Sequence, residues 1–176
     1  LTSIVIPNGV TSIDEYTFYE CSSLESVVIG NSVTSIGEGA FGGCSSLESV
    51  VIPKTLTSIG ISAFSNCTAL KSIEIPASVT SIDSYAFYRC RSLTSIVVDE
   101  GNTVYDSRGN CNAIIENATN KQIAGKGSTK IPEDVTSIGG ASFQECTGLT
   151  SIEIPASVTS IERYAFYGCG NLTSIV

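Results

Sequence analysis

The sequence predicts a right-handed solenoid of 23-residue repeats, mostly β or mixed α and β. Its parallel β-sheet runs along one face and its short helical turns along the other. Leucines recur every 23 residues at Leu1, Leu24, Leu47, Leu70 and Leu93, and again at Leu149 and Leu172. All six phenylalanines and six of the seven cysteines keep the same phase. A unit this short buries its apolar face only by stacking on copies of itself, which defines a solenoid.

The first part of each unit reads L-x-S-I-x-I and alternates with the period of a β-strand. In the first copy, Ile4 and Ile6 point inward and Ser3 and Val5 point outward. Pro7 ends the strand because proline cannot donate a hydrogen bond to a ladder. The repeat therefore predicts parallel strands at residues 2–6, 25–29, 48–52, 71–75, 94–98, about 129–131, 150–154 and 173–175.

The second part of each unit is a shorter extended piece followed by a turn. The V-T-S-I element places Val10 and Ile13 inward. In the A-F-x-x-C element, Phe18 and Cys21 are three residues apart, which is the spacing of one helical turn. Asp14, just before this element, suits a cap or a turn. We therefore expect buried Phe and Cys ladders along the stack, with a short helical turn in each coil.

One long repeat interrupts this phase, since Leu93 and Leu149 are separated by 56 residues instead of 23. Regular repeats cover 1–92 and 149–176, and the long repeat covers 93–148 with a β-rich insertion at about 99–130. Short β-rich runs separated by Gly and Asn predict strands and hairpins that emerge from the solenoid. We expect residues 1–176 to form a single domain that is a piece of a longer protein.

The V-T-S-I and A-F-x-x-C elements resemble the BspA-like subclass of leucine-rich repeats, which occurs in bacterial surface proteins. The resemblance covers nearly the whole chain. It departs from the general leucine-rich consensus because valine or leucine replaces the buried asparagine that follows the strand, as at Val10 and Leu56. It implies an extracellular or outer cell-surface location and adhesion to host matrix protein, glycan or other bacteria.

Composition excludes several classes of function. The 9 basic and 17 acidic residues give a net charge of −8, which disfavours nucleic acid as a partner. The chain has no histidine, the commonest general base and metal ligand. No apolar run is long enough for a membrane span, so we expect no membrane insertion by this segment. We expect a protein that is not an enzyme and that uses no cofactor and no metal.

The cysteines allow two interpretations. All six phased cysteines sit beside a core phenylalanine, where a small free thiol packs well. Adjacent coils are also close enough for disulfides between repeats. Cys111 stands apart in the insertion as an odd, unpaired cysteine.

Surface positions leave two functions open: a binding module, or a structural spacer in a larger surface protein. The outward strand positions repeat serine and valine nearly uniformly, which favours a spacer. The insertion and three pairs of tyrosines favour a binder, since loops not required by a fold are often functional. The uncapped ends also predict self-association. The candidate contact residues are Glu74 and Glu153 on the strand face and Tyr105, Asp106, Arg108, Asn110, Asn112 and Glu116 in the insertion.

Overall fold

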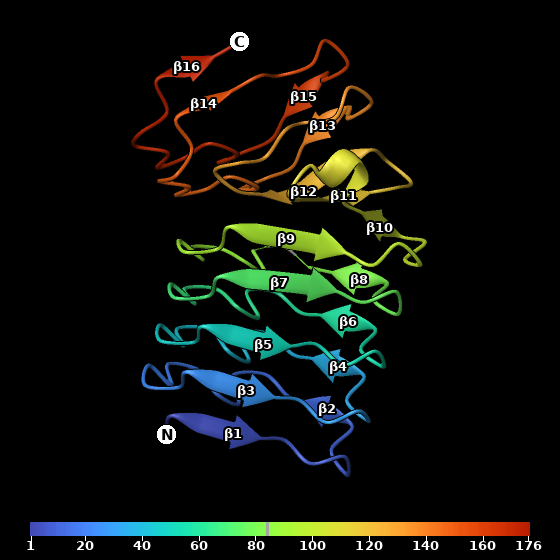
Figure 1. Cartoon of the computed structure of the whole chain (residues 1–176), viewed down its shortest axis with the longest axis vertical. Coiled ribbons are helices and arrows are strands. Elements are labelled where there is room, and N and C mark those ends of the chain that lie inside the picture. Colours follow the sequence, from blue (N-terminus) through green and yellow to red (C-terminus); the bar gives the residue numbers. More distant parts are fainter. Residues whose placement is uncertain (84) are drawn as a thin grey trace.

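The computed structural model describes residues 1–83 and 85–176 and shows a stack of about seven coils. The N-terminus lies at one end of the stack and the C-terminus at the other, with the insertion between β9 and β13 (Figure 1). This arrangement confirms the predicted solenoid with parallel sheets.

The first row of strands lies along one face and comes from the L-x-S-I-x-I element. Its members are β1 (Ser3–Val5), β3 (Ser26–Val28), β5 (Ser49–Val51), β7 (Ser72–Ile75), β9 (Ser95–Val98), β14 (Ser151–Ile152) and β16 (Ser174–Ile175). They pair in parallel as β1-β3-β5, β7-β9 and β14-β16. The register is one full repeat, so that Ser3 pairs with Ser26. Seven of the eight predicted strands are therefore confirmed.

The eighth prediction, a strand at about 129–131, is wrong. The Thr129 hydroxyl donates to the carbonyl of Asn112 at 2.9 Å and accepts the Lys126 N–H at 2.7 Å. The Thr129 N–H also donates to the carbonyl of Lys126. These bonds hold residues 126–129 in a turn, so the chain cannot extend there.

A second row of two-residue strands comes from the V-T-S-I element. Its members are β2 (Ser12–Ile13), β4 (Ser35–Ile36), β6 (Ser58–Ile59), β8 (Ser81–Ile82), β13 (Ser137–Ile138) and β15 (Ser160–Ile161). The first four form one parallel sheet. β13 and β15 belong to a second sheet together with strands of the insertion.

The A-F-x-x-C segments form successive tight turns, so the predicted helical turns are not found there. The Cys21 N–H donates to the carbonyl of Phe18 at 3.1 Å, as one turn requires, but the Phe18 N–H donates to Ala40 of the next coil at 2.8 Å. Tyr16 and Glu20 have φ values of 56° and 57°. Residues with left-handed φ values interrupt a helix. The three-residue spacing of Phe and Cys therefore reflects tight turns, in which hydrogen bonds within the turn alternate with hydrogen bonds to the next coil.

The core follows the predicted ladders. Phe18, Phe41, Phe64 and Phe87 stack in series, with ring centroids 5.2, 5.3 and 5.9 Å apart. Phe143 stacks on Phe166 at 5.1 Å in a second series. The buried apolar residues accordingly form two clusters, one on each side of the insertion.

The insertion forms β10 (Tyr105–Asp106), the 3-10 helix η1 (Arg108–Asn110), β11 (Ala113–Glu116) and β12 (Lys121–Gly125). β10, β11 and β12 pair antiparallel, as the hairpin prediction requires, and β12 then pairs in parallel with β13. The prediction that these hairpins emerge from the solenoid is wrong, because Ala113, Ile114 and Ile115 are fully buried. The insertion lies within the stack, since its apolar side chains join the cores on both sides.

Candidate functional site

The outward face of the first strand row exposes apolar side chains at regular intervals. Val5, Val28, Val51 and Val97 expose 71%, 52%, 66% and 48% of their surfaces. The candidate residues Glu74 and Glu153 occupy the same outward position in two other coils and are exposed. The register pairs Glu74 with Val97 across β7 and β9. This strand face is a row of valines interrupted by two carboxylates in different parts of the stack.

Two candidate residues of the insertion make contacts inside the fold. Tyr105 is 3% exposed, and its hydroxyl accepts the N–H of Ile82 at 3.0 Å. Burial raises the pKa of Tyr105, so the phenol stays neutral. The Asn112 amide accepts the Ile96 N–H at 2.6 Å and donates to the Thr94 carbonyl at 2.8 Å. It thereby closes the free edge of β9, where the strand row is interrupted.

The other candidates of the insertion lie around η1 and the β11–β12 turn. Arg108 Nε donates to Asp106 at 2.8 Å, and the same guanidinium contacts Asn117 and Asp134. Asn110 is exposed, whereas Glu116 is half-buried. Of the six candidates in the insertion, Asn110 is thus the one most open to a partner.

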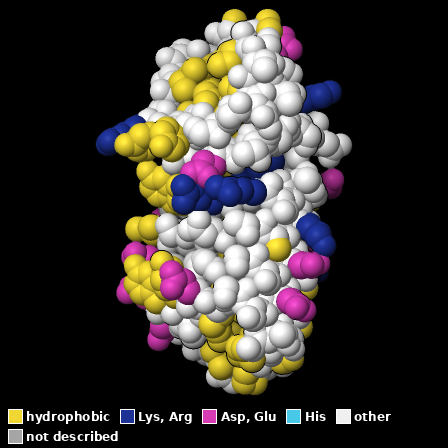
Figure 2. Space-filling view, turned by 90° about the vertical axis from the view of Figure 1, so that its left-hand side faces the viewer, with side chains coloured by type: hydrophobic (Ala, Val, Ile, Leu, Met, Phe, Trp, Pro, Cys, Tyr) yellow, Lys and Arg dark blue, Asp and Glu magenta, His cyan; other side chains and the backbone are white. Residues whose placement is uncertain are grey.

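The three tyrosine pairs lie on the turn edge. Tyr16 with Tyr19, Tyr85 with Tyr88, and Tyr164 with Tyr167 each meet edge to face, at 5.5, 6.1 and 5.6 Å. The first tyrosine of each pair has a left-handed backbone, with φ of 56°, 61° and 63°. Figure 2 shows hydrophobic side chains in separate clusters along this face, so the aromatic surface is discontinuous.

A glycine in the second coil makes room for the tyrosine ring of the first coil. Gly39 takes the left-handed position one repeat after Tyr16, with φ of 56°. A Cβ atom there would lie 2.6 Å from a ring carbon of Tyr16. The missing side chain therefore provides the space for the Tyr16 ring.

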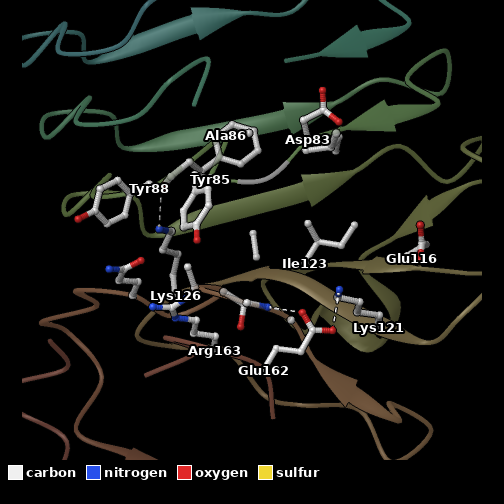
Figure 3. A pocket seen from close by; sticks show the side chains of 18 residues that line it. Asp83, Tyr85, Ala86, Tyr88, Glu116, Lys121, Ile123, Lys126, Glu162 and Arg163 are labelled. Carbon is white, nitrogen blue, oxygen red and sulfur yellow. Dashed lines mark hydrogen bonds and ion pairs between the residues drawn. The ribbon is translucent and has the colours of Figure 1, made fainter. Parts of the chain in front are cut away.

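A cavity of about 410 Å³ opens where the two halves of the solenoid meet, and sequence reasoning did not predict it. It lies between the coil of Tyr85 and that of Ser142, with the end of β12 beside it (Figure 3). Glu145, which follows the lining residue Gln144, accepts hydrogen bonds from Arg89 Nε at 2.7 Å and from Arg91 at 2.6 Å. Arg89, followed by Arg91, lowers the pKa of the Glu145 carboxyl, so this clamp between the halves stays charged.

The seven cysteines are all free thiols. Cys44, Cys67, Cys90 and Cys169 each donate to a phenylalanine carbonyl of the preceding coil, at 3.1, 3.2, 3.1 and 3.1 Å. Of the two interpretations, the structure therefore supports core thiols. Burial raises the pKa of Cys44 and of Cys90 to about 11, and raises that of Cys67 further.

These shifts predict slow alkylation and a loss of stability at high pH. At pH 8 we expect iodoacetamide to label half-exposed Cys21 before Cys44 or Cys90, because raising a thiol pKa from 9 to about 11 leaves about a hundredfold less thiolate.

The same shifts affect stability, because the native state holds the thiol proton more tightly than the unfolded chain, in which the thiol pKa has its ordinary value of 9.0. Stability is therefore full below pH 9 and falls as the pH rises towards about 11. Urea unfolding at several pH values tests the stability prediction. Peptide mass mapping tests the labelling prediction, which equal labelling of all cysteines in the native protein would contradict.

The described residues contain neither a metal-binding cluster nor a membrane-spanning helix. No three His, Cys, Asp or Glu side chains converge there as a metal ion would require. No helix in that part of the chain has the length and hydropathy to cross a membrane.

The model of the BspA type leucine-rich repeat region matches residues 1–115 and 113–176, in six copies. This chain belongs to that family. The family assignment agrees with the stacked parallel strands and with the repeated V-T-S-I and A-F-x-x-C elements. The chain matches none of the curated proteins.

Solved structures of bacterial leucine-rich repeat proteins share this fold. One from Eubacterium ventriosum is 26% identical, with a TM-score of 0.76 over 99% of this chain and 56% of its own. A leucine rich cell surface protein from Faecalibacterium prausnitzii is 30% identical, with a TM-score of 0.59 over 99% and 60%. The pneumococcal vaccine antigen PcpA, at 22% identity, shares the fold with a TM-score of 0.82 over 99% and 50%. The chain thus spans about half the length of these relatives.

Proposed function

We propose that this chain is a non-enzymatic recognition module on the outer surface of a bacterial cell. Its partner is a protein or a glycan of the host or of other bacteria. Membership of a family of bacterial surface proteins supports this location, and so does the described surface location of the Faecalibacterium relative.

The observation that carries the proposal is the exposure of apolar and aromatic side chains at repeated positions. Val5 and Val51 expose 71% and 66% on the strand face, and Tyr167 exposes 59% on the turn edge. The outward serines of the same strands show that small polar side chains also fit the strand face. Exposed apolar rows suit a macromolecular partner, and tyrosine is enriched at such interfaces.

The tyrosines add a second argument. A bulky residue in the left-handed region costs about 1–2 kcal/mol, and glycine would avoid that cost. Tyr16, Tyr85 and Tyr164 nevertheless occupy this position in three coils. The left-handed turn does not require tyrosine, since Gly39, Ser62 and Ala141 take the same position in other coils, so the exposed rings there are consistent with recognition.

The spacer is the second candidate function. It is favoured by the uniform serine row, in which Ser3 pairs with Ser26 and Ser26 with Ser49 across three coils. A spacer would hold another domain away from the cell and would bind nothing itself.

Binding to immobilised host matrix proteins and to bacterial cells tests the proposal. The first variant replaces Val28, Val51 and Val97 with threonine, which keeps the β-branched shape but removes apolar surface. The second carries Glu74→Gln and Glu153→Gln. The matched control, Ile61→Thr, makes the same kind of change at a residue 45% exposed outside the strand rows.

We expect the intact chain and the control to bind, and the valine variant to bind at least about tenfold more weakly, because losing the contribution of even one buried valine, about 1.5 kcal/mol, corresponds to about tenfold. If the glutamine variant binds normally, the two carboxylates lie outside the contact surface. If the intact chain binds neither matrix proteins nor cells, the spacer function replaces recognition.

A further inference from the structure

The ladder of hydrogen bonds between turn segments stops at the insertion. In the regular coils the N–H groups of Phe18, Phe41 and Phe64 each donate to the next coil at 2.8 Å. After Phe87 the corresponding acceptor is the carbonyl of Ser142, which instead accepts the N–H of Gly125 at 2.9 Å. Among residues 1–83 and 85–176, the Phe87 N–H has no hydrogen-bond partner. The Phe87 N–H, which points towards the next coil, therefore faces the cavity where the two halves of the solenoid meet, called the junction cavity from here on.

The cavity exists because the insertion replaces only part of a coil. β12 supplies a strand for the second row, where Lys121 pairs with Ser137. The insertion has no A-F-x-x-C segment, so nothing continues the turn layer between Phe87 and Phe143. The resulting volume of about 410 Å³ is within the usual range for a small-molecule site.

Polar groups in this cavity are left unpaired. Ser142 is 5% exposed, and its hydroxyl has no partner within the described part of the chain. The Gln144 Oε1 atom is likewise buried and unpartnered there. Buried polar groups of folded proteins are nearly always hydrogen-bonded, so the unpaired groups lining this cavity are available to bind water or the polar groups of a ligand.

Lys126 brings an uncompensated charge to the same cavity. It is 7% exposed, and its ammonium donates to the carbonyl of Phe87 at 3.4 Å. Among the ion pairs of the described residues, none involves Lys126. The equivalent carbonyl one coil earlier, that of Phe64, accepts a hydrogen bond from the neutral thiol of Cys90. A neutral donor is therefore enough for this carbonyl, and a buried ammonium is costly without an anion.

The remaining walls limit the kind of anion. Glu162 is paired with Lys121 at 2.7 Å, while Asp83 and Glu116 lie towards the end away from Lys126 (Figure 3). These carboxylates would repel a polyanion. Tyr85 lies next to Lys126 in the same view and offers an aromatic ring to an apolar ring face.

We propose that the junction cavity binds the carboxylated sugar of an acidic glycan. Lys126 and the Phe87 N–H bind its carboxylate, Ser142 and Gln144 bind hydroxyl groups, and Tyr85 packs against the sugar ring. A single carboxylate can pair with the Lys126 ammonium, near which the Arg163 guanidinium also lines the cavity, and hydroxyl groups satisfy the neutral polar atoms. This inference rests on the proposed recognition function and gives it a ligand class.

Calorimetric titration with glucuronic acid and N-acetylneuraminic acid tests the inference, with glucose, N-acetylglucosamine and acetate as comparison ligands. We expect the acidic sugars to bind at least about tenfold more tightly than the comparison ligands. Lys126→Gln should weaken acidic-sugar binding about tenfold to a hundredfold, which corresponds to losing a charge-assisted hydrogen bond. Lys54→Gln removes an exposed lysine remote from the cavity and should change nothing.

Gln144→Glu is the second variant, and it is needed if circular dichroism shows that Lys126→Gln does not fold. It is nearly isosteric and adds a negative charge to the cavity that repels the acidic ligand, so it should weaken binding by a similar factor. Equal binding of neutral sugars or acetate would overturn the inference, as would normal acidic-sugar binding by either folded variant. If neither acidic sugar binds while the intact chain still binds matrix proteins or cells, the inference fails and the recognition function stands.

Discussion

Replacing Phe64 with alanine should lower the free energy of unfolding by about 3–5 kcal/mol. Phe64 is fully buried, and its ring stacks between Phe41 at 5.3 Å and Phe87 at 5.9 Å. The substitution removes contacts to both neighbouring coils and leaves a cavity that the backbone hydrogen bonds prevent from collapsing. Urea unfolding followed by circular dichroism measures the loss.

Phe166→Ala is the matched control because it makes the same change near the end of the stack. Phe166 is half-buried and stacks on Phe143 alone, at 5.1 Å. We expect a smaller loss there. Equal losses at both positions would show that the aromatic ladder does not govern stability.

The 23-residue phase is sufficient to predict the regular coils. It places Ile4, Phe18 and their equivalents at the same point of every unit, and stacking is the one arrangement that buries them all. Both strand rows and the two Phe series follow from this phase. Repetition makes the prediction reliable because each copy is independent evidence for the same local structure.

The turn layer shows where spacing alone misleads. Phe18 and Cys21 are three residues apart in a helix and also in two linked turns, so the spacing fits both. The left-handed φ of Tyr16 decides between them, and tyrosine gives no signal for it. Gly39 and Gly43 take the left-handed positions of the next coil, and those glycines are the signal in the sequence that could have identified the turns.

The insertion could be predicted in its local pairing but not in its position. Alternation and turn residues predict the β11–β12 hairpin. The pairing of β12 with β13 is a contact with the next repeat, and no local pattern specifies it. The same holds for the junction cavity, because Ser142 and Lys126 come together only once β12 has taken its place in the stack.

Asn102→Ala should destabilise the protein by about 3–4 kcal/mol, because one buried side chain here satisfies four backbone groups. Asn102 is 7% exposed. Its amide donates to the carbonyls of Pro76 at 2.8 Å and Val79 at 2.9 Å. Its Oδ1 atom accepts the N–H groups of Val104 and Tyr105, both at 2.9 Å. Alanine removes all four bonds at the start of the insertion, although the Pro76 carbonyl keeps the N–H of Val79 at 3.2 Å. Urea unfolding measures the cost.

Two comparison variants separate the contributions of Asn102. Asn102→Asp keeps the acceptor for Val104 and Tyr105 but loses both donors and sets a carboxylate against two carbonyls. We expect it to be destabilising at pH 7 and less so at acid pH, where the protonated carboxyl can donate again. Asn171→Ala removes a single exposed hydrogen bond to the Thr147 carbonyl and should cost less than about 1 kcal/mol. If Asn102→Ala costs no more than Asn171→Ala, this asparagine does not anchor the insertion to the preceding coil.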